Sequence, residues 1–403
     1  MKTASESVAR VSAQTSAADL RQWIRSLESK YEIEPRLNAL LNERLLADSS
    51  GAAFSRPTVS EIKSNLRRFL ASQLGEDFTL ENMSKMSGGA GNETYKFELV
   101  SGDSSQHLIL RVKAPGACCD THIPSEYQAM KAVEGFLPIP EPLWLIRDST
   151  YFGGAALICR FLEGVQAPPS ESLKASAMGA VFGDELRREL APQFIEYEAK
   201  LHSFDWARSN LTEFAKPRPG TTDAIDWRLA FWDRVWEQDL IEEHPTMILS
   251  REWLEKHKPV ADHISLLHGD FRNGNFLYDQ ETSRITGILD WELCSLGDRH
   301  CDLGYTMLPA WGHDDANGEF LNAGLATLAE FTRIYERQSG LKIDPERLHY
   351  YIIFNIWWSA VALLGTALTH AAARRTQMDV LYNLISGKGG YDICDLNRMI
   401  VEN

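Results

Sequence analysis

The sequence predicts an α+β architecture of two lobes, in which a small β-rich lobe precedes a larger helical lobe and a helical extension precedes both. Residues 79–113 form short, partly alternating apolar segments separated by the turns GGAGN and SGDSS, a pattern typical of a strand meander. From residue 164 onward the apolar spacing is mostly helical. The first 57 residues contain apolar side chains at helical spacing that belong to neither lobe.

The N-terminal helical extension is expected to cover residues 1–57. Residues 1–17 are small, polar and aperiodic, which predicts disorder. Residues 18–48 carry apolar side chains at helical spacing, and the segment SSGAAFSRPT (49–58) ends that pattern. Such an amphipathic stretch must bury its apolar face, either against the chain's own lobes or against a second copy in a homodimer.

The small N-lobe is expected over residues 58–163 and the helical C-lobe over residues 164–403. A helix over 58–74 begins the N-lobe, with Thr58 or Ser60 as its N-cap. Strands at 79–86, 94–100 and 107–113 follow, then a helix over 125–137 and strands near 143–147 and 155–162. In the C-lobe, one strand-rich insert, HGDFRNGNFLYD and then RITGILDWE, interrupts the helices.

The composition is that of a globular protein with an acidic surface. Of 403 residues, 44% are hydrophobic and 24% are charged, and the formal net charge is −15. That charge argues against nucleic acid or an anionic membrane surface as the main partner. The six cysteines form no C-x-x-C pair and the first residues lack an apolar signal core, so a cytoplasmic protein with reduced thiols is expected.

Two segments near the C-terminus allow competing interpretations. Residues 350–369 carry no formal charge and are long enough to span a bilayer. We expect a buried core helix there, with a membrane span as the alternative. The segment SGKGG (386–390) lacks the first glycine and the Ser or Thr of a Walker motif, so we expect a mobile turn.

The strongest chemical signal is the segment LLHGDFRNGNFLYDQETSRITGILDWE, residues 266–292. Asn275 follows Asp270 by five positions, and Asp290 ends an apolar strand fifteen positions later. Phosphoryl transfer needs a carboxylate to take the proton of the acceptor hydroxyl, together with oxygen ligands for Mg²⁺. The spacing predicts Asp270 as the base, and Asn275 and Asp290 as magnesium ligands. The alternative is a set of plain turn residues between strands.

These motifs resemble those of the aminoglycoside-phosphotransferase/choline-kinase superfamily, which is related to the protein kinases. The resemblance is carried by HGDxxxxN, LDWE and LGDRHCDLGYTM, and it covers roughly residues 75–370. The sequences LRVKAPG, LHSFDW and LDWELCSLGD are similar to the branch related to kinase domains fused to acyl-CoA dehydrogenases. The resemblance implies a bilobal protein-kinase-like fold, ATP as the phosphate donor, and Asp302 as a support for the loop that carries Asp270.

The resemblance also implies nucleotide-binding residues in the N-lobe. Arg111 would grip the phosphates where a protein kinase uses Lys, with Lys113 as the runner-up on the same face of the strand. Glu126 would be the partner of that cation. A glycine-rich turn, for which a plain hairpin is the alternative, would lie over the phosphates through Gly88, Gly89, Gly91 and Asn92.

The expected function is an ATP-dependent transfer of phosphate to a hydroxyl of a small molecule. A hydroxyacyl or hydroxy-acid acceptor and an aminoglycoside or amino-alcohol acceptor both remain open. Candidate acceptor contacts are Glu292, Trp291, Arg272, Trp311, Trp357 and Trp358, with Arg299 or Arg374 and Arg375 for an anionic acceptor. The alternative is a pseudokinase that serves as a binding or scaffold module, but the acidic and amide groups of the motif are all present.

Overall fold

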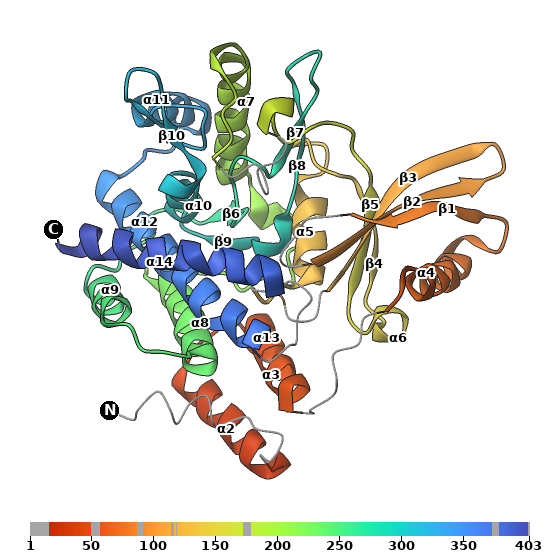
Figure 1. Cartoon of the computed structure of the whole chain (residues 1–403), viewed down its shortest axis with the longest axis horizontal. Helices are drawn as coiled ribbons and strands as arrows, with labels where there is room; N and C mark the ends of the chain where they lie inside the picture. The colour runs from red at the N-terminus through yellow and green to blue at the C-terminus, as the bar shows by residue number, and fades with distance from the viewer. Residues whose placement is uncertain are drawn as a thin grey trace.

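The N-lobe is built on one antiparallel sheet of five strands. The computed structural model describes residues 16–49, 57–86, 92–113, 117, 119–171, 179–372 and 379–401. The strands lie in the order β1-β2-β3-β5-β4 (Figure 1), with bounds β1 Thr79–Lys85, β2 Asn92–Ser101, β3 Ser104–Lys113, β4 Pro142–Ile146 and β5 Ala156–Arg160. The predicted meander and the two later strands are confirmed, with ends that differ by a few residues.

The two faces of this sheet pack against different helices because side chains alternate along each strand. Leu108 and Leu110 of β3 pack with α4 (Val59–Leu74), whereas Ile109 packs with α5 (Ile123–Val133) and the C-lobe core. Thr58 caps α4 through a capping box with Glu61, which confirms one of the two expected caps. Helix α5 begins earlier and ends earlier than predicted. A short helix, α6 (Ser149–Phe152), joins β4 to β5.

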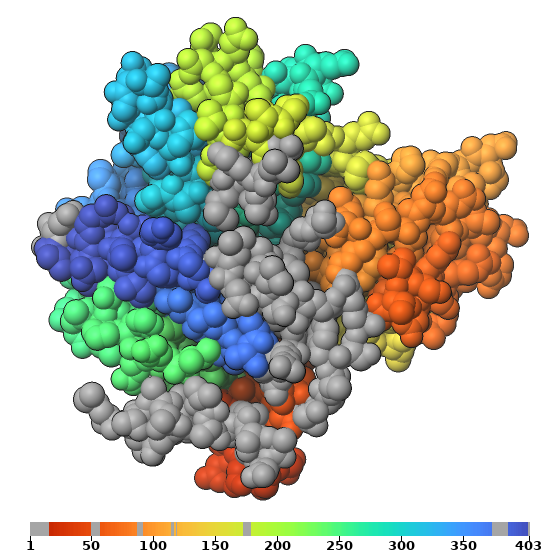
Figure 2. All heavy atoms as spheres, viewed as in Figure 1, coloured from red at the N-terminus to blue at the C-terminus, as the bar shows by residue number. Residues whose placement is uncertain are grey.

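The C-lobe is a body of helices around short strand pairs, and the N-lobe projects from it (Figures 1 and 2). Strand β6 (Ser265–Leu267) pairs with β9 (Ser295–Gly297), and β7 (Phe276–Tyr278) pairs with β8 (Ile285–Ile288). The hairpin β10 (His313–Asp314) and β11 (Phe320–Leu321) lies further along the chain. The helices are α7 Asp184–Ser203, α8 Asp223–Asp239, α9 Pro245–Lys256, α10 His300–Thr306, α11 Leu328–Ser339, α12 Pro345–Ala360, α13 Leu368–Ala372 and α14 Asp379–Val401.

The long apolar segment near the C-terminus is a helix of the C-lobe core. Helix α12 continues through a π-helical turn, Val361–Ala367, into α13. By length and composition the helix Pro345–Ala372 could cross a membrane, but 72% of its most apolar window is buried inside the protein. This burial agrees with the core helix expected from the sequence.

The segment SGKGG does not form the predicted mobile turn. Residues 386–390 lie inside α14, where Lys388 pairs with Asp392 at 2.7 Å and donates a hydrogen bond to Ser359. A Cβ at Gly389 would lie 2.7 Å from Cγ of Leu364, so glycine allows this helix to approach its neighbour closely. Tertiary packing here overrides the low helix propensity of glycine.

The extension forms two helices rather than one continuous stretch. Helix α2 covers Ala17–Lys30 and α3 covers Pro35–Ser49, and Pro35 occupies the first position of α3. Leu41 is fully buried in a cluster with residues of α8 and α12, so α3 packs on the chain's own C-lobe. Residues 1–15, for which we expect disorder, lie outside the described residues.

Candidate active site

The loop between β6 and β7 carries Asp270, and the buried carboxylate of Asp302 holds the backbone of this loop. Asp302 of α10 accepts hydrogen bonds from the backbone N–H groups of His268 at 2.6 Å and of Gly269 at 2.8 Å. Gly269 has φ +86°, and a Cβ there would lie 2.3 Å from the carbonyl oxygen of Leu293. The loop therefore requires glycine at this position, and Asp302 occupies the supporting place that the resemblance implied.

Asp302 remains an anion although it is completely buried. Burial acts to raise its pKa, but the hydrogen bonds from His202 and from the N–H group of His268 help to hold that pKa below the ordinary range. His202 is itself fixed between Asp302 at 3.3 Å and the hydroxyl of Tyr335 at 2.9 Å. These contacts fix the loop from the side of α7 and α11.

Two donors fix the orientation of the Asp270 side chain. Arg272 Nε donates to its Oδ1 at 2.9 Å, and Asn275 Nδ2 donates to its Oδ2 at 2.7 Å. The guanidinium of Arg272 also lies 4.5 Å from the ring centroid of Trp311. Burial and then the charge of Asp270 raise the pKa of Tyr305 well above its ordinary value, so its phenol stays protonated beside the carboxylate.

Asp290 lies at the end of β8, next to Asn275. The N–H of Leu289 donates to the carbonyl of Asn275 at 2.8 Å, and His268 Nε2 donates to the carbonyl of Leu289 at 2.8 Å. Asp290 itself has φ +65°, a left-handed conformation that turns the chain as it leaves the strand. The structure thus brings Asp270, Asn275 and Asp290 together at one edge of the C-lobe.

Arg111 of β3 joins both lobes by pairing with three carboxylates. Its Nε lies 3.2 Å from Glu126 of α5, its Nη1 2.9 Å from Asp290 and its Nη2 3.0 Å from Glu292. Lys113 pairs with Asn92 through the strand ladder, and its side chain forms no hydrogen bond or ion pair with any residue that the structure describes. Arg111, rather than Lys113, therefore holds the position of the cation paired with Glu126.

Two of the three carboxylates around Arg111, Glu126 and Asp290, differ in how easily they ionise. Burial raises the pKa of Glu126, which is 1% exposed, and Arg111 lowers it less than burial raises it. For Asp290, which is 33% exposed, burial again acts upward, but Arg111 and Arg272 bring the pKa below its ordinary value. Of these two carboxylates, Asp290 is therefore the better suited to bind a cation.

The glycine-rich turn expected over the phosphates lies mostly outside the described residues, which exclude Gly88, Gly89 and Gly91. Asn92, at the start of β2, donates from Nδ2 to Glu292 at 2.7 Å. Glu292 therefore contacts both Arg111 and Asn92. Glu292 is expected from the sequence as an acceptor contact, and no local pattern signals its pairing with the N-lobe.

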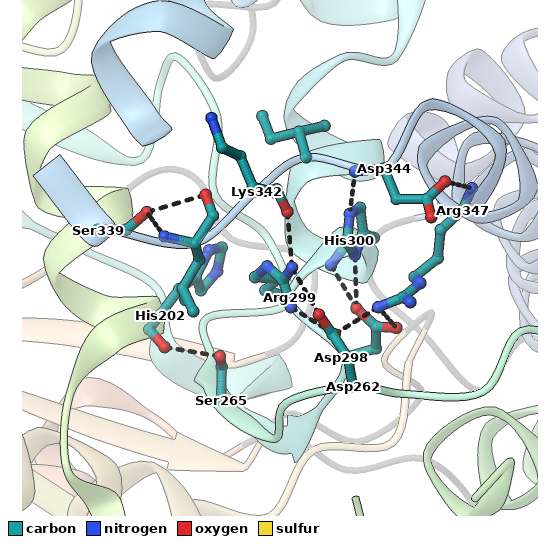
Figure 3. Close-up of polar contacts among 12 residues, drawn as sticks. His202, Asp262, Ser265, Asp298, Arg299, His300, Ser339, Lys342, Asp344 and Arg347 are labelled. Atoms are coloured by element: carbon teal, nitrogen blue, oxygen red, sulfur yellow. Dashed lines mark hydrogen bonds and ion pairs between the residues drawn. The ribbon is translucent and has the colours of Figure 1, made fainter. Parts of the chain in front are cut away.

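A network of ion pairs and hydrogen bonds surrounds Arg299 and His300, which shortly precede Asp302 in the sequence (Figure 3). Arg299 donates to Asp262 at 2.7 Å and to the carbonyl of Lys342 at 2.6 Å, and Asp298 accepts from His300 at 2.7 Å. Arg299 is 2% exposed and already paired, so the suggestion that it binds an anionic acceptor is wrong. Its role is to fix the chain that leads into Asp302.

A cavity lies beside the site, between the extension and the C-lobe. Its lining comprises Glu34, Arg36, Leu37, Cys119, Asp120, His122, Trp227, Arg228, Phe231, Trp232, Glu292, Leu293, Cys294, Ser295 and Trp358. A row of stacked aromatic rings leads from the cavity to Tyr305, which lies beside Asp270. The ring centroids of Trp232 and Trp358 are 4.9 Å apart, and those of Trp358 and Tyr305 are 5.7 Å apart. Two other candidates for acceptor contacts, Trp291 and Trp357, are each 1% exposed and belong to the core.

Comparisons with known proteins agree with this geometry. A family model described as the phosphotransferase enzyme family matches residues 83–340. The chain is 26% identical over 340 residues to acyl-CoA dehydrogenase family member 10 of Mus musculus, covering 80% of this chain but only 30% of that relative's length.

Two solved structures share the fold at low sequence identity. A thermostable mutant of aminoglycoside phosphotransferase APH(4)-Ia, in ternary complex with ADP and hygromycin B, has a TM-score of 0.52 at 17% identity. The match covers 83% of this chain and 98% of the solved chain. Choline kinase LicA from Streptococcus pneumoniae has a TM-score of 0.50 at 12% identity, covering 85% of this chain and 99% of its own. The predicted bilobal kinase-like fold is confirmed.

Proposed function

This chain belongs to the phosphotransferase enzyme family and is a small-molecule kinase with a hydroxyl acceptor, and we propose that it uses ATP with Asp270 as its catalytic base. The observation that supports the proposal best is the convergence of Asp270, Asn275 and Asp290, with Arg111 reaching Asp290 from the N-lobe at 2.9 Å. Phosphoryl transfer relies on positioning and charge stabilisation, and these residues supply the required groups.

The residues at the site suit Mg²⁺ as the metal. Asn275 uses its Nδ2 to hold Asp270, which leaves its amide oxygen for a cation, and Asp290 adds a carboxylate. Within the described ranges no group of three His, Cys, Asp or Glu side chains forms a metal site. Phosphate and water oxygens would complete the coordination, as Mg²⁺ commonly requires. When bound, Mg²⁺ neutralises charge on the phosphates.

In the proposed chemistry, Asp270 transfers a proton while neighbouring residues hold its carboxylate in position. Asp270 accepts the proton of the acceptor hydroxyl, whose oxygen forms a bond to the γ-phosphorus. The bond from that phosphorus to the β–γ bridging oxygen breaks, ADP leaves, and Asp270 later releases its proton to water. Arg272 and Asn275 hold the carboxylate in place throughout.

The cavity favours an acceptor of the hydroxy-acid or hydroxyacyl type over a cationic aminoglycoside. Each of its three carboxylates contacts an arginine: Glu34 contacts Arg36, Asp120 contacts Arg44 and Glu292 contacts Arg111. Arg44 and Arg111 also pair with carboxylates outside the lining. Arg228 donates to Ser295 at 2.9 Å and lies over Phe354, but it pairs with no carboxylate of the described residues. Arg228 is therefore a cation of the cavity lining with which an acidic acceptor can pair, beside an aromatic wall.

A screen of acceptors tests this function. ADP release with Mg²⁺ is measured with hydroxy acids, hydroxyacyl-CoA thioesters, choline-like alcohols and aminoglycosides. We expect a phosphate ester from an acidic acceptor, and Arg228→Met should raise the KM of that acceptor while leaving the KM of MgATP unchanged. Phosphorylated product from aminoglycosides alone would contradict the acidic acceptor. MgATP binding without any product would favour the pseudokinase alternative.

A further inference from the structure

One residue of the N-terminal extension contacts both lobes, next to the residues that hold Arg111. The family model begins at residue 83, so α2 and α3 lie outside the family match. Arg36, at the start of α3, nevertheless donates to Ser125 Oγ at 2.6 Å and to the carbonyl of Cys294 at 3.5 Å. Ser125 belongs to α5 of the N-lobe, whereas Cys294 belongs to the C-lobe.

The neighbours of these two contacts are the residues that hold Arg111. Ser125 directly precedes Glu126, and Cys294 follows Glu292 by two positions. Helix α5 also packs directly on the turn Trp291–Leu293, which follows Asp290. A displacement of α5 from this turn would therefore move Glu126 away from Arg111 and weaken its hold on Asp290.

Arg36 is itself fixed from two further directions. Its Nε pairs with Glu34 at 3.0 Å, and its guanidinium lies 4.7 Å from the ring centroid of Phe214 in the C-lobe. Its side chain is 9% exposed, so the contacts are largely shielded from water. Charge-assisted bonds in such surroundings are stronger and more directional than surface pairs.

A second arginine of the same helix makes a parallel bridge. Arg44 pairs with Asp120, in the connector before α5, and with Asp239 of α8, both at 3.0 Å. Together the two arginines tie the start of α5 to the C-lobe through α3, whose Leu41 is buried in the C-lobe core. The contacts of α3 thus bridge the two lobes.

We infer that Arg36 is a positioning residue that couples the extension to the nucleotide site by fixing α5 against the turn after Asp290. The inference rests on the proposed function for its effect on MgATP, but its structural claim stands apart from it. Arg36 touches none of the residues that we assign to proton transfer or to the metal, so it acts through Glu126 and Arg111.

Four variants test the inference: Arg36→Ala, Ser125→Ala, the double variant, and Lys30→Ala as the matched control. Lys30 also joins the extension to the C-lobe, through Glu237, but contacts neither α5 nor the turn after Asp290. Hydrogen exchange across residues 123–133 reports the position of α5, and calorimetry reports MgATP affinity. Ser125→Ala keeps the test open should Arg36→Ala fail to fold.

We expect Arg36→Ala to speed exchange in α5 and to weaken MgATP binding by about 5–30-fold, the loss of a charge-assisted hydrogen bond. The double variant should lose less than the sum of the two single variants, because Arg36 and Ser125 share one interaction, although Ser125 also bonds His122 at 2.7 Å. Lys30→Ala should change neither readout. Unchanged exchange in α5, or additive effects of the two substitutions, would overturn the inference. A parent protein that binds no MgATP would contradict the proposed function, and hydrogen exchange would still decide the role of Arg36.

Discussion

Arg111 Nη1 lies 2.9 Å from Asp290 Oδ1, and this contact joins residues that are 179 positions apart in the sequence and belong to different lobes. Because Arg111 also pairs with Glu126 and Glu292, one guanidinium contacts three carboxylates at the interface. The position of Asp290 therefore depends on the position of the N-lobe sheet.

Replacing Arg111 should affect both stability and nucleotide use. Arg111→Met leaves buried Glu126 without a cation and beside other carboxylates, a loss of about 3–5 kcal/mol in the free energy of unfolding. It should also raise the KM of MgATP. Lys113→Met should change stability by no more than about 0.5 kcal/mol. Urea unfolding and steady-state kinetics give both comparisons, and the reverse order would shift the phosphate-gripping role to Lys113.

Asp290→Ala should abolish magnesium-dependent nucleotide binding. The structure leaves this carboxylate partly exposed and ionised beside Asn275, so its removal takes away the charged metal ligand. Titration calorimetry with MgATP measures the loss, and ATP in the presence of EDTA provides the metal-free control. Equal MgATP affinity in the variant and the parent would exclude Asp290 as a metal ligand.

Glu198 of α7 should make stability fall as pH rises. Burial, and then the charge of Asp302, raise its pKa well above the ordinary value, against a hydrogen bond from Thr306. Between its unfolded and folded pKa values the folded state holds the extra proton, so unfolding free energy drops by about 1.4 kcal/mol per pH unit. Glu198→Gln removes that slope. Denaturation at several pH values between about 5 and 8 should show the unfolding free energy of the variant rising relative to that of the parent as pH rises. A difference in unfolding free energy that stays constant with pH would refute the raised pKa of Glu198.

Two leucines of α3 test whether the extension is docked in solution. Leu41 is fully buried against α8 and α12, whereas Leu46 is 48% exposed. Leu41→Ala should cost about 2–5 kcal/mol of stability, and Leu46→Ala about 0.5 kcal/mol or less. Thermal or urea denaturation separates the two. A small effect from both substitutions would mean that α3 leaves the C-lobe surface.

Local patterns predicted the strands, the cap of α4 and the loop motif because each depends on residues close in sequence. Thr58 and Glu61 lie three positions apart, and Asp270 and Asn275 lie five apart. The contact of Arg36 with Ser125 spans 89 positions and leaves no periodic signal. The break between α2 and α3 could have been found, since Pro35 is a common first residue of a helix.

Burial is the other property that the sequence did not reveal. Arg299 has the charge that an anionic acceptor needs, but the structure buries it in an ion pair with Asp262. Arg228 carries the same charge and lines the cavity. Only tertiary packing distinguishes the two arginines, because their charge and side-chain chemistry are identical. The glycines of α14 were misassigned for the same reason.

The central claim is that Asp270 takes the proton of the acceptor hydroxyl during transfer of phosphate from MgATP. Asp270→Asn keeps the shape of the side chain but removes the base, so turnover should fall by about 10²–10⁴-fold. MgATP affinity should stay close to that of the parent, because Asn275 and Asp290 are untouched. The decisive measurement is acceptor-dependent ADP formation in the parent and the variant, alongside MgATP binding by calorimetry. Parent-like turnover in Asp270→Asn would contradict the account.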